Sequence, residues 1–100
     1  MRFMPLLALL LAACTSPAPE FFGAHRHQVR EGGLDFVVFW SASRAEVVRK
    51  GYLARAQRDA VPELMVRAVE RASGCRVIPG SMTTGLPGDT GEARVDLDCG

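Results

Sequence analysis

Alternating apolar and polar residues in the first half of the chain predict a β-hairpin. Residues 34–43 would place Leu34, Phe36, Val38 and Trp40 on one side of a strand and Asp35, Val37, Phe39 and Ser41 on the other. The second side is mixed, which is typical of a strand partly covered on both faces. Residues 25–31 form the preceding run, and Gly32-Gly33 accept the positive φ angles of a type I′ turn. We therefore expect two antiparallel strands joined by this turn.

Helical periodicity is clearest over residues 59–73. The apolar positions that share one face of this helix are Val61, Leu64, Met65, Ala68, Val69 and Ala72. Asp59 can cap the free N–H groups at the start, and Pro62 is tolerated within the first turn. Gly74 is a natural end because it adopts positive φ readily. The segment is predicted to be an amphipathic helix that packs by its apolar face.

The remaining segments complete an α+β pattern. Ser43-Arg44 is predicted to be a second turn, residues 45–49 a third strand or a short helix, and residues 50–58 a loop. Residues 75–83 and 92–99 are predicted to form a final hairpin. The resulting order, β-β-β-α-β-β, predicts a small antiparallel sheet with one amphipathic helix packed on one face.

The first residues of the chain carry a different signal. Arg2 precedes an uncharged apolar run over residues 3–13, which has the length of a secretory signal and is shorter than the roughly 20 residues that span a bilayer. The run ends in Leu11-Ala12-Ala13-Cys14, which closely resembles the lipobox of bacterial lipoprotein precursors. The alternatives are an ordinary signal peptide with an incidental cysteine and a cytosolic protein with an apolar N-terminal strand.

The lipobox resemblance implies both an anchor and a location. Residues 1–13 would be removed as a signal peptide, and Cys14 would carry diacylglycerol and an acylated amine, with fatty acids such as palmitate. Two or three acyl chains hold a protein stably at a bilayer. The product would be a lipoprotein of the bacterial cell envelope, facing the periplasm. Thr15, in place of the aspartate that often signals inner-membrane retention, favours the outer membrane.

Chain organisation and charge follow from this interpretation. Residues 14–24 would be the lipidated cysteine and a flexible linker with two prolines, and residues 25–100 a single domain. Phe21-Phe22 could pack at the domain edge or dip into the lipid interface. Of the 12 Lys and Arg, Arg2 leaves with the signal peptide, so the basic residues balance the 11 acidic ones. Near-neutral charge without a basic stripe argues against a nucleic-acid partner.

Two cysteines remain once Cys14 is assigned to lipid. Export to an oxidising compartment makes a disulfide between Cys75 and Cys99 the expected state. Pro87 and Gly88 suit the centre of a type II turn, and the two cysteines are equally distant from residue 87. An antiparallel hairpin would therefore place them nearly opposite each other. Pro79 interrupts the first strand, which should then be an edge strand or carry a bulge.

Metal binding is one candidate chemistry. His25 and His27 are two residues apart, so on a strand they point to the same side. Zinc or copper would need further ligands, and Asp96 and Asp98 are the available carboxylates, which could also act as a pair. The alternative is that the histidines are polar residues at a strand start and that the aspartates lie on a solvated strand face.

Catalytic and stacking residues give weaker signals. The hydroxyl nucleophile candidates are Ser41, Ser43, Ser73 and Ser81, and none sits in a Gly-x-Ser-x-Gly motif. Trp40 and Tyr52 could stack on a sugar or a peptide, although Trp40 on an apolar strand face suits a core. The sequence therefore predicts no catalytic site and no cofactor.

The sequence favours a structural or protein-interaction module of the cell envelope. Its partners would be the lipid bilayer, through acylated Cys14, and another envelope protein. The contact surface would be a sheet edge or the mixed strand face around Val37 and Phe39. A periplasmic metal-binding protein that uses His25 and His27 is the alternative, and a small hydrolase is a third possibility without a supporting motif.

Overall fold

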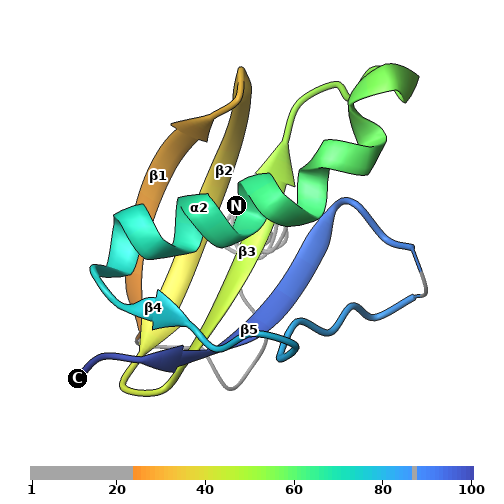
Figure 1. Cartoon of the computed structure of the whole chain (residues 1–100). Helices are drawn as coiled ribbons and strands as arrows, with labels where there is room; N and C mark the ends of the chain where they lie inside the picture. Colours follow the sequence, from red (N-terminus) through yellow and green to blue (C-terminus); the bar gives the residue numbers. More distant parts are fainter. Residues whose placement is uncertain (1–23, 87) are drawn as a thin grey trace, which may run out of the picture.

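The first three strands follow one another as antiparallel neighbours. They are β1 (His25–Glu31), β2 (Leu34–Ser41) and β3 (Arg44–Lys50), as Figure 1 shows. The structure is a computed structural model that describes residues 24–86 and 88–100. The signal peptide, the lipobox and the linker up to residue 23, including Phe21-Phe22, lie outside the described residues, as does Pro87.

The turn between β1 and β2 has the predicted conformation. Gly32 and Gly33 have φ angles of 58° and 81°, as a type I′ turn requires. A Cβ atom on Gly32 would lie 2.6 Å from Cδ2 of Leu64, whereas one on Gly33 would meet no atom within 4 Å. Gly32 is therefore favoured by its positive φ, and a methyl group at this position would also have to displace the end of the Leu64 side chain.

Strand β2 is covered on both faces, as its alternation predicted. Leu34, Phe36 and Val38 face the helix and are buried in the main core. Val37 and Phe39 form a second buried cluster on the opposite face, with Val48 of β3 among the residues that pack against it. The sheet therefore has one fully apolar face and one mixed face.

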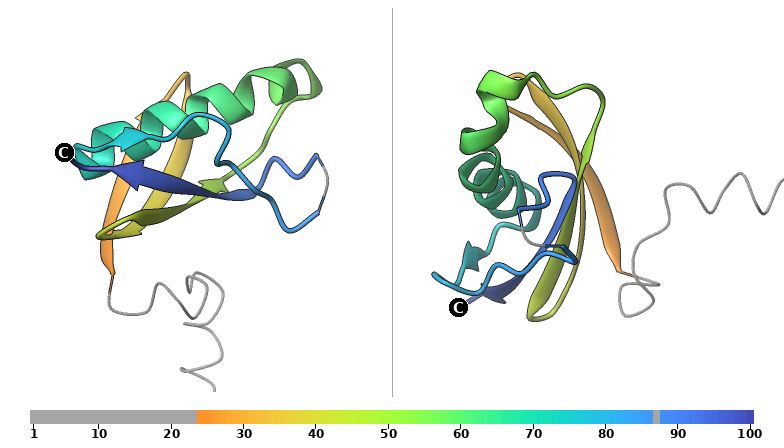
Figure 2. Two further views of the ribbon diagram at one scale, coloured as in Figure 1. Left: turned by 60° about the horizontal axis from the view of Figure 1, so that its bottom comes forward. Right: turned by 90° about the vertical axis from the view of Figure 1, so that its right-hand side faces the viewer.

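The helix α2 (Val61–Ser73) crosses the apolar face of the sheet, as the two views of Figure 2 show. It ends as predicted, because Gly74 takes a φ of 74° and donates its N–H to the carbonyl of Glu70 at 2.9 Å. The buried residues of α2 are Val61, Met65, Ala68 and Val69. The predicted apolar face is confirmed.

The start of the helix differs from the prediction. A 3₁₀-helix, η3 (Arg55–Ala60), runs directly into α2, so Asp59 lies inside this turn and is not the N-cap. Ala60 occupies the N-cap position and makes no side-chain hydrogen bond. The loop expected over residues 50–58 is therefore shorter, since β3 continues to Lys50 and η3 begins at Arg55. The 3₁₀-helix leads directly into the first turn of α2, at the position where a capping side chain was expected.

The last two strands complete the sheet in the order β1-β2-β3-β5-β4. Strand β5 (Glu92–Asp98) inserts between β3 and β4 (Arg76–Val77), so the last strand is interior and β4 is an edge. The predicted strand over residues 75–83 is reduced to two residues because the chain turns at Pro79, and it rejoins β5 in an isolated bridge at Thr83. Both the edge position and the interruption agree with the prediction.

The disulfide forms between the predicted cysteines. Arg76 pairs with Asp98, so Cys75 and Cys99 lie opposite each other one residue further along, with Cα atoms 4.4 Å apart and a sulfur–sulfur bond of 2.02 Å. The Asp89 N–H donates to the Leu86 carbonyl at 3.1 Å. The bond holds the short β4 against β5.

Candidate interaction surface

The structure separates the candidate metal ligands. His25 and His27 are both exposed and lie on the face of β1 that shares its side with Trp40, whose ring centroid is 5.2 Å from that of His25. Asp96 and Asp98 lie on the opposite face of the sheet, on β5, with β2 and β3 in between. Within residues 24–86 and 88–100, no group of three or more His, Cys, Asp or Glu is placed to hold a metal ion.

The two aspartates face basic residues of neighbouring strands. Asp96 forms an ion pair with Arg44 of β3, with 3.3 Å between Oδ1 and Nε. Asp98 lies opposite Arg76 in the register of β4 and β5. The Asp96 side chain is 51% exposed and Asp98 is exposed, so both lie on a solvated strand face, which is the alternative given for them above. Their basic neighbours favour the pairing of the strands.

The candidate serines are held in local structure or lie at a turn. Ser73 Oγ donates to the Val69 carbonyl at 2.7 Å and accepts the N–H of Cys75 at 3.1 Å. Ser81 Oγ donates to the Ile78 carbonyl at 2.6 Å and accepts the N–H of Asp96 at 3.0 Å. Ser41 and Ser43 are exposed at the turn between β2 and β3.

The candidate stacking residues lie at different places. Trp40 is half-buried against the main core, as the core interpretation predicted, while Tyr52 is 87% exposed. Trp40 and His25 also line a hollow of about 370 Å³ beside the disulfide. Its lining residues are Ala24, His25, Trp40, Ser41, Ala42, Cys75 and Cys99.

A pair of carboxylates on the mixed face, Glu46 buried and Glu92 half-buried, was not predicted from the sequence. Glu46 of β3 is 4% exposed, and Arg94 Nε lies 3.7 Å from its Oε2 and 3.2 Å from Oε2 of Glu92. Burial, a side-chain hydrogen bond with Glu46 and the charge of Glu46 raise the pKa of Glu92 from 4.5 to about 7, against the opposing effect of Arg94. The alternation within β5 shows that Glu92 and Arg94 share a face, but only the register between β3 and β5 brings them close to Glu46.

Strand β1 is the longer edge of the sheet. Its two-residue turn makes Glu31 and Leu34 the first hydrogen-bonded pair, and bonded and non-bonded pairs then alternate along an antiparallel ladder. The N–H and C=O groups of Arg26, Gln28 and Arg30 therefore point away from β2. By contrast, β4 is only two residues long and lies beside the disulfide.

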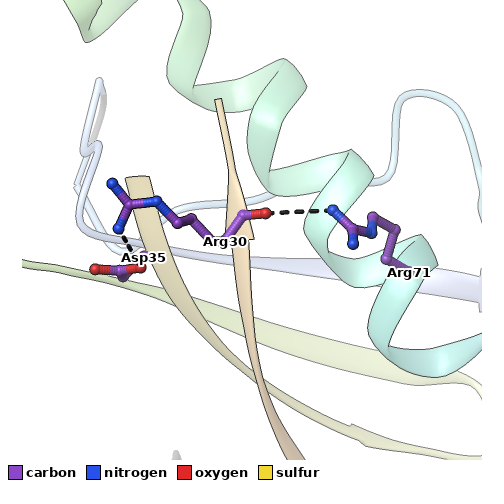
Figure 3. A network of polar contacts seen from close by, with 3 residues as sticks. All are labelled: Arg30, Asp35 and Arg71. Carbon is purple, nitrogen blue, oxygen red and sulfur yellow. Dashed lines mark hydrogen bonds and ion pairs between the residues drawn. The ribbon is translucent and has the colours of Figure 1, made fainter. Parts of the chain in front are cut away.

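The contacts of Arg30 support this assignment. Its carbonyl, on the side away from β2, accepts a hydrogen bond from Arg71 Nη1 at 3.3 Å, while its side chain reaches across to Asp35 of β2 at 3.1 Å (Figure 3). Arg71 Nη1 also donates to Glu31 Oε2 at 2.6 Å. Arg71 thus ties the helix to the last residues of β1 and leaves the first part of the edge open.

The outward backbone groups of Arg26 and Gln28 bond to no other residue in the described part of the chain. Unpaired N–H and C=O groups along a strand edge are a template for a further strand. The edge position of β4 was predicted from Pro79, but that of β1 was not, because alternation does not show which strands are neighbours.

The side chains on the mixed face of β1 are basic or neutral. Arg26, Gln28 and Arg30 alternate there, and the guanidinium carbon of Arg26 lies 6.0 Å from the centroid of the Phe39 ring. Beside them is a shallow hollow of about 330 Å³. Its lining residues are Gln28, Val29, Arg30, Asp35, Phe36 and Lys50.

No described helix is long and apolar enough to cross a membrane. Comparisons of the chain with protein-family models, with curated proteins and with solved structures found no match.

Proposed function

We propose that this chain is a lipid-anchored protein of the bacterial cell envelope whose α+β domain binds another envelope protein. The open edge of β1 carries the binding part of the proposal. It offers backbone groups that have no bond to other described residues, beside arginine side chains and a shallow hollow. Such an edge is the usual requirement for recognition by strand addition.

The anchor part of the proposal rests on Leu11-Ala12-Ala13-Cys14 and the apolar run before it. Acyl chains on Cys14 would hold the domain at a membrane surface, and the linker with its two prolines would keep it at a short distance from that surface. Thr15 favours the outer membrane, with the domain facing the periplasm. Attachment to a surface raises the local concentration of any partner that is attached to the same membrane.

Mass spectrometry of the mature N-terminus tests the anchor. We expect an N-terminal peptide that begins at Cys14 and carries the added mass of diacylglycerol and an acyl chain. The Cys14→Ser variant should lose this mass and leave the membrane fraction. An unmodified Cys14, or cleavage at another site, would contradict the anchor.

Extraction of native membranes with several mild detergents tests the binding role. We expect the wild-type protein to elute as part of a larger complex, and a photoreactive amino acid at position 28 to crosslink one defined envelope protein. The same amino acid at position 55, on η3, is the matched control and should give no such product. Elution as a monomer in every detergent, with no crosslink from position 28, would contradict the binding role.

A further inference from the structure

We propose that the partner contributes an extended acidic segment, which adds to β1 as a sixth strand of the sheet. This inference rests on the proposed binding function and specifies the chemistry of the partner. Its basis is the combination of an open backbone edge with the arginines that β1 carries on its mixed face.

The backbone supplies the first part of the recognition. The N–H and C=O groups of Arg26 and Gln28, and the N–H of Arg30, all point away from β2. An added strand could pair with these groups without breaking any bond between β1 and β2. The Arg30 carbonyl is already bonded to Arg71 at 3.3 Å, so pairing would extend from Ala24 towards Arg30.

Arginines on the mixed face supply the second part. Arg30 has a carboxylate partner in Asp35, but Arg26 makes no ion pair with any residue that the structure describes. Residues directly opposite on neighbouring strands have Cβ atoms about 5 Å apart, within reach of an ion pair. A carboxylate on the added strand opposite Arg26 would supply the missing counter-charge.

The helix side of the edge adds no net charge. Arg71 reaches β1 through the Arg30 carbonyl and through an ion pair with Glu31 at 2.6 Å, and Arg67, one turn earlier on α2, forms an ion pair with Glu63 at 3.3 Å. The preference for carboxylates would therefore come from the mixed face, where the added strand would pass beside Arg26 and Arg30.

The hollow on the mixed face offers a place for one of these carboxylates. It is bordered by the cations Arg30 and Lys50, and among the described residues that line it Asp35 alone is acidic. Gln28, also in the lining, lies on the open edge itself. A glutamate side chain that entered from the added strand would therefore meet more positive than negative charge.

A second copy of this chain fits the edge poorly. The mixed face of β1 carries Arg26, Gln28 and Arg30 and no carboxylate, so β1 of another copy brings no counter-charge. A symmetric antiparallel pairing centred on Gln28 would place Arg26 directly opposite Arg30 of the other copy, and like charges in that position are destabilising. The charge pattern therefore favours an acidic partner over self-association.

A synthetic peptide in which glutamate alternates with threonine is a suitable probe. The full lipidated chain in detergent micelles is titrated with this peptide and with a control peptide that has glutamine in place of each glutamate. We expect only the acidic peptide to bind, to protect the amides of Arg26 and Gln28 from hydrogen exchange, and to lose affinity between about 50 and 300 mM salt.

Substitutions on the edge separate the backbone and charge contributions. Gln28→Pro removes an N–H that points away from β2, which edge strands tolerate, and should weaken binding at least about tenfold. Gln28→Ala keeps the N–H and should bind nearly as well as wild type. Arg26→Gln should weaken binding about 2- to 5-fold, whereas Arg55→Gln, on η3, should have no effect. Far-ultraviolet circular dichroism checks that each variant is folded.

The outcomes distinguish this inference from the function on which it rests. Equal binding of both peptides, or binding unaffected by Gln28→Pro, would overturn the acidic-strand proposal. A defined crosslink from position 28 without peptide binding would retain the binding function and reject the acidic strand. A dimer of the wild-type protein that is lost in Gln28→Pro would identify a second copy of this chain as the occupant of the edge. That result would also reject the acidic strand.

Discussion

At the scale of single residues, the structure shows where a small chemical change has the largest effect. Gly32 combines a positive φ with a close contact to Leu64, while Gly33 has a positive φ and open space around it. The two glycines of one turn therefore differ in a way that the Gly-Gly pair in the sequence does not reveal. Glu92 is a second such residue, because burial and Glu46 alter the pKa of its side chain.

Gly33→Ala should lower the free energy of unfolding by about 1 kcal/mol, since alanine must adopt a left-handed conformation. Gly32→Ala should cost about 1 kcal/mol more because the new methyl group displaces the Leu64 side chain. Urea denaturation of both variants measures this difference. In a Leu64→Ala background the two costs should become equal, and a difference that persisted there would contradict the proposed contact.

Glu92 should make stability depend on pH. The folded protein holds the Glu92 proton up to about pH 7, whereas the unfolded chain releases it near pH 4.5. Between these values the unfolded state binds fewer protons, so the free energy of unfolding should fall as pH rises from about 4.5 to 7 and level off above. With allowance for solvent screening the decrease is on the order of 1 kcal/mol.

Glu92→Gln should flatten this pH dependence and stabilise the protein above pH 7. Glu46→Gln should shift the decrease to lower pH, since the Glu46 side chain contributes to the raised pKa of Glu92. Denaturation midpoints between pH 4 and 8 test both variants. An unchanged pH profile in Glu92→Gln would show that another group is responsible.

At the scale of elements, local sequence predicted what depends on local geometry. The Gly32-Gly33 turn, the apolar face of α2 and the opposition of Cys75 and Cys99 each follow from spacing within one segment, and all three are present. The insertion of β5 between β3 and β4 depends on long-range pairing, which periodicity does not specify. The open edge of β1 and the approach of Glu46 to Glu92 follow from that pairing, so neither was predicted.

Strand β4 should depend on the disulfide more than any other strand does. Besides its two pairs with β5, two further hydrogen bonds hold this segment. The Val77 N–H donates to Glu70 Oε2 at 2.9 Å, and the Ile78 N–H donates to the Asp96 carbonyl. Cys75→Ala/Cys99→Ala should lower the free energy of unfolding by about 3 kcal/mol. Hydrogen exchange should show early loss of protection at Val77 and Ile78 and retained protection in β1–β2. Uniform loss in all strands would contradict this dependence.

At the scale of the whole molecule, the structure suggests how an anchored domain would be oriented. The hollow next to the disulfide brings together Ala24, the β2–β3 turn and the last residues of the chain. The linker from Cys14 would join the domain at this end. Strand β3 runs from this end of the domain towards Tyr52 at the other end. At about 3.3 Å per residue the two ends are roughly 20 Å apart. Trp40 would therefore lie nearer the bilayer than Tyr52.

Energy transfer from tryptophan to dansyl-labelled lipid headgroups measures this orientation. Trp40 is the single tryptophan of the chain, so the wild-type protein reports on the end near the linker. Trp40→Phe/Tyr52→Trp moves the donor to the opposite end and should give weaker transfer. Cys14→Ser, without the anchor, should give little transfer in either background. Equal transfer from both positions of the anchored protein would contradict the proposed orientation.

The arginines of β1 also affect the tendency of the protein to aggregate. A strand edge that is left uncovered invites copies of the same protein to stack into aggregates, above all at the high local concentration of a membrane surface. Arg26 and Arg30 share one face of that edge, and their like charges would act as gatekeepers against pairing with an identical chain. A form with both residues neutral would lose this protection. The charges that would select an acidic partner would thus also prevent an uncovered edge from starting an aggregate.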